Sequence, residues 1–242
     1  MKHLAFIPAR GGSTGILNKN LELVGGKPIV RWAYDFCSEN EIFDTVLLST
    51  DSPKISETIF KSDYISNLIE DRLHFLSKKE AIHRRSQTDS GTFSLIKDLV
   101  IKLSEYTELN FDYLWLIQPT SIFREKNDIK LLLKIIEGKM EWTSIVSVKD
   151  FTSNHPERMF NFKENYLEPF MNNTKIENIP RQLLQKVYIK DGAFYIFKKT
   201  NLQNNIFLGD KVLPYFRSSS RNVNIDDYED LNYARYVMDK ND

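Results

Sequence analysis

Short apolar runs alternate with amphipathic stretches along the first 150 residues of the chain. The apolar runs have the length of buried strands, and the stretches between them repeat apolar residues at helical spacing. The pattern predicts strands at Leu4–Ile7, Thr45–Ser49, Leu73–Leu76, Tyr113–Ile117 and Ile145–Val148, with helices at Pro28–Asn40, Pro53–Lys61, Ser90–Ser104 and Asp128–Glu137. Such alternation favours an α/β fold: a three-layer α/β/α sandwich with a mostly parallel sheet.

The pattern changes after residue 149. The stretch Lys149–Gln185 is polar, contains three prolines and has no long period. Beyond it we expect a strand at Val187–Phe197, interrupted at Asp191-Gly192, then a strand at Val212–Phe216 and a helix at Asp227–Met238. We interpret 1–242 as one domain that carries an insertion at 150–185, and we expect the insertion to make a subunit contact.

Composition narrows the classes of partner. Lys plus Arg and Asp plus Glu both number 33, so the formal net charge is zero, which argues against a general nucleic-acid or membrane-surface binder. The single cysteine, Cys37, lies in a helical pattern and is expected to be a buried thiol in a reducing compartment. We see neither a signal-peptide pattern nor an apolar run of about 20 residues, so we expect a cytoplasmic protein.

Candidate chemistry follows the first strand, at the sheet edge where open α/β folds bind ligands. A glycine-rich loop runs from Ala9 to Asn20, with Arg10 and Lys19 near its two ends. Glycines allow backbone N–H groups to approach an anion, so the loop suits a triphosphate. It has neither the Walker pattern nor the dinucleotide-binding pattern. The alternative is a flexible loop with ordinary surface cations.

Two later segments add polar groups. Gln118 leaves the fourth strand at its carboxyl end, and Arg124 has the geometry to pair with a phosphate or carboxylate. The alternative is the start of a helix with a Ser or Thr cap. Asn224 and Asp226 share one face of an extended segment and are two oxygen ligands suited to Mg²⁺. The alternative there is a strand end that leads into a helix capped by aspartate.

Taken together, these segments resemble the acylneuraminate cytidylyltransferases, which make CMP-activated nonulosonic acids. The matching segments follow the family's order along nearly the whole chain: Ile7–Ser13, Lys19-Asn20, Gly26-Lys27-Pro28, Ser49-Thr50-Asp51, Leu116–Ser121 with Arg124, Pro180-Arg181-Gln182, Asp191–Ile196 and Asn224-Ile225-Asp226. The resemblance implies a Rossmann-like fold of the nucleotide-diphospho-sugar transferase type. It also implies a homodimer in which the inserted segment reaches the partner's active site.

The resemblance further implies one reaction: the anomeric hydroxyl of an acidic sugar attacks the α-phosphorus of CTP, and pyrophosphate leaves. Arg10, Lys19 and Asp226 are then catalytic, Gln118, Arg181 and Tyr195 contact the sugar, and Asp226 with Asn224 binds Mg²⁺. The nucleotide-binding residues that it implies are Ala9, Arg10, Gly11, Gly12, Ser13, Thr14, Lys19, Asn20 and Asp89.

Four departures from the family pattern leave other functions open. Thr14 stands where the family has lysine, Asn224 where it has aspartate, and Ile189 where it often has arginine. The loop that begins at Ser77 lacks the family's arginine, although Arg84 or Arg85 is close enough in sequence to replace it. Each lost charge-assisted hydrogen bond is worth about 1.5–3 kcal/mol. A nucleotidyltransferase for another sugar or base, or a silent homologue that binds nucleotide, is therefore an alternative.

Overall fold

The computed structural model describes residues 1–13, 15–59, 96–97, 100, 110–171, 180–217 and 222–240. The chain divides into two compact units, which are described separately. The first comprises Met1–Ser147 and Asp191–Asp242, and the second comprises Val148–Lys190. The expected insertion at 150–185 falls within the second unit.

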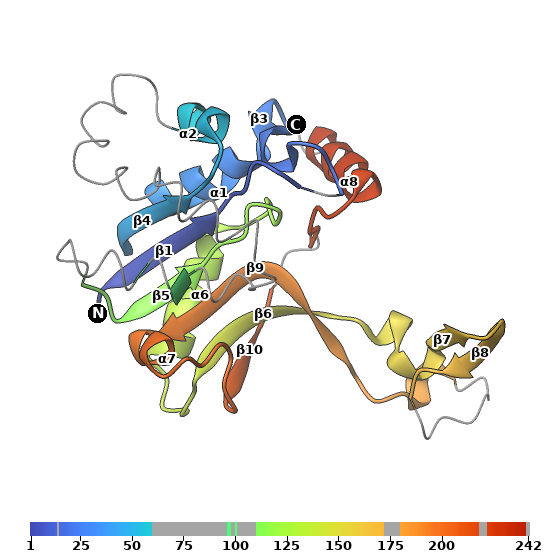
Figure 1. Cartoon of the computed structure of the whole chain (residues 1–242). Coiled ribbons are helices and arrows are strands. Elements are labelled where there is room, and N and C mark those ends of the chain that lie inside the picture. The colour runs from blue at the N-terminus through green and yellow to red at the C-terminus, as the bar shows by residue number, and fades with distance from the viewer. Residues whose placement is uncertain are drawn as a thin grey trace. The chain divides into compact units, whose positions relative to one another are not determined.

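The first unit is built on a six-stranded sheet with the strand order β10-β6-β9-β5-β1-β4 (Figure 1). Its strands are β1 (His3–Pro8), β4 (Phe43–Ser49), β5 (Tyr113–Leu116), β6 (Ser144–Asp150), β9 (Tyr188–Lys198) and β10 (Val212–Phe216). Strand β1 pairs in parallel with β4 and with β5, whereas β5 pairs antiparallel with β9. The first two pairings bring the carboxyl ends of β1, β4 and β5 to one edge.

Four described helices of this unit lie close to the predicted ranges, whereas the short helix Lys199–Gln203 was not predicted. These five helices are α1 (Ile29–Ser38), α2 (Pro53–Ile59), α6 (Lys126–Ile136), α7 (Lys199–Gln203) and α8 (Tyr228–Asp239), with a 3₁₀ turn η1 (Lys19–Leu21) and a small ribbon of β2 (Leu23–Val24) and β3 (Lys27–Pro28). Asp227 caps α8 by accepting from the Asp230 N–H, and Ser52 accepts from the Ile55 N–H at the start of α2. Among the described residues, we find no helix that is long and apolar enough to cross a membrane.

Both faces of strand β1 are buried, as expected for a parallel sheet covered by helices. On one face Ala5 and Ile7 of β1 pack in a core with α1 and α6, and on the other Leu4 and Phe6 are completely buried. The α/β/α prediction is thus confirmed. Cys37 lies in this core, as predicted, and burial raises the pKa of its thiol to about 12.

One strand prediction is wrong, one predicted strand is not described, and one predicted helix is described only in part. Strand β9 continues through Asp191-Gly192, because Gly192 adopts a left-handed φ of 80° that a side chain would disfavour. The predicted strand Leu73–Leu76 lies outside the described residues. Of the predicted helix Ser90–Ser104 only Ile96, Lys97 and Val100 are described, and all three are helical.

The second unit contains a two-stranded antiparallel ribbon of β7 (Phe160–Lys163) and β8 (Tyr166–Pro169). Three 3₁₀ turns accompany it: η3 (Thr152–Asn154), η4 (Pro156–Arg158) and η5 (Arg181–Leu183). His155 caps η4 by accepting a hydrogen bond from the Glu157 N–H at 3.1 Å.

Candidate active site at the carboxyl edge of the sheet

The loop after β1 is tied to the end of β4 by two backbone donors. The Ala9 N–H donates to the Ser49 carbonyl at 2.8 Å, and the Gly11 N–H donates to Asp51 Oδ1 at 2.5 Å. A Cβ on Gly11 would lie 2.9 Å from the Ser52 Cβ, so this glycine permits a close approach. Its N–H faces the protein, which differs from the expected orientation toward an anion. Gly12, by contrast, has open space at its Cβ position.

Two residues that were expected to contact the nucleotide form hydrogen bonds with the backbone of this loop. Ser13 Oγ donates to the Ile16 carbonyl at 2.5 Å and accepts from the Lys19 N–H at 3.3 Å. Asn20 is buried, and its side-chain amide donates to the Arg10 carbonyl at 2.9 Å. Arg10 itself is exposed at the start of the loop. The loop is therefore shaped by its own polar side chains, and the expected nucleotide contacts stay predictions.

The far end of the chain meets this loop at Lys19. The ammonium of Lys19 donates to the Ile225 carbonyl at 2.9 Å and lies 3.4 Å from Asp226 Oδ1. Gly15 makes the approach possible, because a Cβ there would lie 2.6 Å from the Asp226 carbonyl oxygen. The Lys19 side chain is only 15% exposed, whereas that of Asp226 is 69% exposed. The structure thus brings together an aligned ammonium and a carboxylate that is open to solvent.

A small apolar core holds these two segments together. Ile16, Ile225 and Leu231 are completely buried in a cluster shared by the glycine-rich loop, the β2–β3 ribbon and helix α8. Because Ile225 points into this cluster, its neighbours Asn224 and Asp226 are directed to the opposite side of the extended segment. Burial of one isoleucine therefore places the two polar side chains toward the loop.

Both polar atoms of the Asn224 side chain, Oδ1 and Nδ2, form hydrogen bonds. Its Oδ1 accepts from Thr120 Oγ1 at 2.7 Å and from Ser121 Oγ at 3.3 Å, and its Nδ2 donates to Asp226 Oδ2 at 2.6 Å. The backbone N–H of Ile225 also donates to the Thr120 carbonyl at 3.0 Å. We call Lys19, Thr120, Ser121, Asn224 and Asp226 the edge cluster.

The fit of this cluster to Mg²⁺ rests on Asp226. Its exposed carboxylate is a ligand of the kind that Mg²⁺ prefers, one that leaves other positions to water and phosphate. The described residues contain no group of three or more His, Cys, Asp or Glu side chains placed to hold a metal. The expected ligand role of Asn224 stays a prediction, and its oxygen faces two hydroxyl donors.

Gly192 lies at the centre of the expected sugar side of the site. A Cβ at this position would come within 2.8 Å of Gln118 Oε1 and 2.9 Å of both Asn224 Oδ1 and Ser121 Oγ. Three oxygens therefore converge over a glycine that also needs a positive φ. Gln118, expected to contact the sugar, is thus next to the edge cluster. The sequence signal was the Asp191-Gly192 pair, interpreted there as a break in a strand.

Arg124 is not placed to bind a ligand phosphate. Its Nε donates to the Ala193 carbonyl at 3.0 Å and its Nη2 to the Gln118 carbonyl at 2.5 Å. The guanidinium lies over the rings of Phe36 and Phe194, with centroid distances of 5.9 and 5.6 Å. Burial lowers the pKa of Arg124 to about 9. The ligand role considered for Arg124 is replaced by a structural one that fixes the backbone of Gln118.

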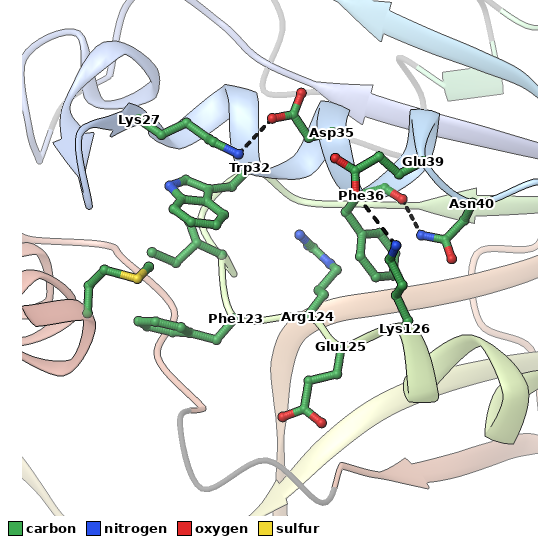
Figure 2. A pocket seen from close by; sticks show the side chains of 12 residues that line it. Lys27, Trp32, Asp35, Phe36, Glu39, Asn40, Phe123, Arg124, Glu125 and Lys126 are labelled. Carbon is green, nitrogen blue, oxygen red and sulfur yellow. Dashed lines mark hydrogen bonds and ion pairs between the residues drawn. The ribbon is translucent and has the colours of Figure 1, made fainter. Parts of the chain in front are cut away.

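Figure 2 shows Arg124 pointing from the segment after β5 toward helix α1, beside a pocket of about 260 Å³. Lys27 and Asp35 form an ion pair at 2.8 Å on one side of this pocket, and Lys126 and Glu39 form one at 3.8 Å on the other. The acidic and basic side chains around the pocket therefore largely compensate each other.

Two more predicted residues are described, one in each unit. Tyr195 is buried on β9, its ring is stacked on Phe207 with a centroid distance of 6.3 Å, and burial raises the pKa of its phenol. Arg181 begins η5 in the second unit. Thr14, Asp89, Arg84 and Arg85 lie outside the described residues. The expected contacts of all these residues stay predictions.

A second polar cluster, which the sequence did not reveal, lies behind the edge cluster. We call Asp128, Ser147, Asp191, Tyr215 and Arg217 the buried cluster. Arg217 Nη1 donates to Asp191 Oδ2 at 3.3 Å, Arg217 Nε lies 3.8 Å from Asp128 Oδ2, and Tyr215 Oη donates to Asp128 Oδ1 at 2.7 Å. Ser147 Oγ also donates to Asp191 Oδ1. Ser121 Oγ links the two clusters, because its single proton is shared between the Asp191 carbonyl at 3.0 Å and Asn224 Oδ1 at 3.3 Å.

Comparison with known proteins supports a nucleotidyl-transfer site. A family model described as cytidylyltransferase matches residues 4–68. The N-acylneuraminate cytidylyltransferase of Escherichia coli is 27% identical over 240 residues, which cover 99% of this chain and 52% of that protein. The pseudaminic acid cytidylyltransferase of Campylobacter jejuni is 24% identical over 243 residues, which cover 100% of this chain and 98% of that protein. This chain therefore spans about half the length of the first relative and nearly all of the second.

The fold agrees with these matches. The solved structure of CMP:2-keto-3-deoxy-manno-octonic acid synthetase complexed with CTP aligns with a TM-score of 0.62 at 14% identity, over 100% of both chains. At this identity the likeness shows a shared fold. The sequence matches and the order of the motifs make this chain similar to the acylneuraminate cytidylyltransferases along nearly its whole length.

Proposed function

We propose that this protein transfers CMP from CTP to the anomeric hydroxyl of an acidic nonulosonic sugar. The sugar oxygen forms a bond to the α-phosphorus, the bond from that phosphorus to the bridging oxygen breaks, and pyrophosphate leaves while the hydroxyl proton passes to solvent. Catalysis of this kind depends on positioning and on stabilising charge at phosphate oxygens. The observation that carries the proposal is the contact of Lys19 with Asp226 beside the glycine-rich loop.

Lys19 suits the role of the charge-stabilising cation. Its ammonium has a fixed direction, because the Ile225 carbonyl and the Asp226 carboxylate both accept from it. An ammonium that is held in advance needs little reorganisation when charge develops on the α-phosphate. Arg10, which is exposed at the other end of the loop, supplies a second cation for the outer phosphates.

Mg²⁺ is the cofactor that we propose, with Asp226 as the residue that would hold it. The exposed carboxylate at the loop is an oxygen ligand that leaves coordination positions for phosphate and water. The ion would supply further positive charge to the triphosphate. We assign the sugar contact to Gln118, adjacent to Gly192, because its amide both donates and accepts.

A pyrophosphate-release assay tests the function directly. The protein is mixed with Mg²⁺, one of the four ribonucleoside triphosphates and one of a panel of 2-keto-3-deoxy sugar acids, and the product is identified by mass spectrometry. We expect release only with CTP and a nonulosonic acid. Release with another triphosphate or another sugar class would replace this proposal by a different nucleotidyltransferase. Saturable CTP binding without release would establish a silent homologue.

We also propose that the protein is a homodimer formed through the β7–β8 ribbon. Phe160 and Phe162 alternate along β7, and register places Leu167 opposite Phe162, so these three side chains share one face. They are 44%, 73% and 62% exposed, whereas Asn161, Lys163, Tyr166 and Glu168 occupy the other face. An exposed apolar face of this kind is typical of an interaction surface, and a second copy of the chain would cover it.

The mass in solution tests the dimer. Sedimentation or light scattering should give twice the 28.4 kDa of one chain. Phe162→Asp should shift the protein to a monomer, because it buries a carboxylate in the contact. Asn161→Asp, on the opposite face of the same strand, is the matched control and should leave the mass unchanged. A wild-type protein of single-chain mass at micromolar concentration would contradict the proposal.

A further inference from the structure

The edge cluster contains an amide where the family pattern has a second carboxylate, and its contacts suggest a different task. Asn224 Nδ2 donates to Asp226 Oδ2 at 2.6 Å, a charge-assisted hydrogen bond. Asn224 Oδ1 has two lone pairs, and the hydroxyls of Thr120 and Ser121 donate to that same atom. The amide is thus held by three partners, and its oxygen is directed away from Asp226.

The reverse orientation of the amide is unfavourable. Turning the side chain over would place Oδ1 against Asp226 Oδ2 at the distance now spanned by a hydrogen bond. Two oxygens without a proton or a cation between them repel each other, and the present bond would be lost. The hydrogen-bond network therefore assigns the nitrogen to the Asp226 side.

A carboxylate at this position would behave differently. With aspartate at 224, two negative charges would face each other at hydrogen-bond distance, and like charges this close oppose ionisation of both. Such a pair needs a cation to hold it together. With asparagine, the pair is attractive whether a cation is bound or not.

We propose that Asn224 is a positioning residue and not a metal ligand: its amide, fixed by Thr120 and Ser121, holds the Asp226 carboxylate toward Lys19. The edge cluster is thereby assembled before any cation arrives, and Asp226 is the protein carboxylate that a metal would meet. The consequence for metal handling rests on the proposed function, whereas the hydrogen-bonded pair itself does not.

Thermal unfolding with and without metal tests this role, with no nucleotide or sugar present. In EDTA, Asn224→Asp should lower the Tm by about 2–4 °C, the shift expected for each kcal/mol in a chain of this size. Excess Mg²⁺ should remove that deficit, because the new carboxylate pair then binds the ion. The wild type should change far less with Mg²⁺. Asn204→Asp, an exposed asparagine, is the control for a change of net charge.

A swap of the two residues keeps the test decisive if the single variant folds poorly. Asn224→Asp combined with Asp226→Asn restores one amide and one carboxylate at the same separation, so the Tm in EDTA should recover most of the loss. Asn224→Ala should show a deficit in EDTA that Mg²⁺ does not remove, since it adds no carboxylate.

Three outcomes would overturn the proposal. An Asn224→Asp protein as stable as wild type in EDTA would mean that the two side chains do not interact without metal. A deficit of the same size with and without Mg²⁺, or a swap that restores nothing, would mean a purely structural role. A failed pyrophosphate assay with a successful swap would reject the proposed function and leave the pair intact.

Discussion

The edge cluster and the buried cluster are linked by the hydrogen bond from Ser121 to the Asp191 carbonyl, but their charged side chains differ in exposure. Those of the buried cluster are compensated by protein partners, whereas the Asp226 carboxylate faces solvent. The side chains of Arg217 and Asp191 are each 1% exposed and that of Asp128 is 2% exposed, and every one of them has an opposite charge or a hydroxyl beside it. The Asp226 side chain is 69% exposed, so its carboxylate is open to solvent. A charge that is compensated by protein partners stabilises a fold, whereas one that faces solvent remains able to bind a ligand.

This comparison predicts that the two clusters respond to substitution in different measurements. Substitutions in the buried cluster should change the free energy of unfolding. Substitutions in the edge cluster should change turnover while the fold persists.

Arg217→Met should cause the largest loss. It leaves Asp191 and Asp128 buried without their shared cation, and removal of one partner from a buried ion pair costs about 3–5 kcal/mol. Urea unfolding measures the change. Arg235→Met is the control, because that arginine is 40% exposed and pairs with Glu22 at the surface. A loss of unfolding free energy below about 1 kcal/mol would contradict the distinction between the clusters, because an exposed ion pair contributes that much.

Lys19→Ala should affect catalysis more than stability. Loss of one preorganised charge-stabilising donor typically lowers kcat by about 10²–10³-fold. Binding of CTP should weaken much less, because the role concerns the reacting phosphate. Steady-state kinetics and calorimetric CTP titration separate the two effects. Equal losses in kcat and in CTP affinity would assign Lys19 to binding alone, and Lys211→Ala, far along the chain at an exposed pair, is the control.

Gly192→Ala should disturb both clusters at once. The new Cβ meets three oxygens at 2.8–2.9 Å and the backbone has a φ of 80°, so we expect a cost of about 1–3 kcal/mol for the strained conformation. The same change should displace the Gln118 side chain and therefore raise the KM for the sugar. Gly12→Ala is the control, because its Cβ position is open. If Gly192→Ala leaves both the free energy of unfolding and the KM unchanged, the three oxygens move apart at little cost.

Tyr215→Phe should have the smallest effect at neutral pH, about 1–2 kcal/mol for a buried acceptor that loses a donor. Burial, and then the hydrogen bond to Asp128, raise the pKa of Tyr215 above that of a free tyrosine. The folded state therefore keeps a proton that the unfolded chain loses above about pH 10. Stability from this group is present below that pH and falls as the pH rises through it.

Urea unfolding at pH 8 and pH 10.5 measures this dependence. The wild type should lose more stability between the two values than Tyr215→Phe does. Tyr236→Phe, at a tyrosine that is 57% exposed, should behave like the wild type. Equal alkaline losses in wild type and Tyr215→Phe would show that the phenol of Tyr215 ionises freely in the fold.

Much of this architecture follows from local pattern. Apolar runs and helical spacing located the strands of the sheet and helices α1, α6 and α8 to within two residues at each end, because burial on one face repeats at a period that a sequence displays. The glycine-rich loop and the Asn224–Asp226 pair were visible for the same reason. The expectation of a break at Asp191-Gly192 failed because a residue with positive φ can lie inside a strand. Composition alone does not show whether such a glycine interrupts a strand or lies within it.

The partners of each polar side chain were decided by the tertiary structure. Thr120 and Asn224 are 104 residues apart, and Lys19 and Asp226 are 207 residues apart, so no local period links them. Arg124 resembled a phosphate ligand in the sequence, yet it lies under α1 with its donors on two carbonyls. Sequence determined which chemical groups exist and which strands and helices carry them. Burial of Ile16 and Ile225 in one core determined which of those groups meet, because hydrogen bonds act over about 3 Å and only packing sets distances that short.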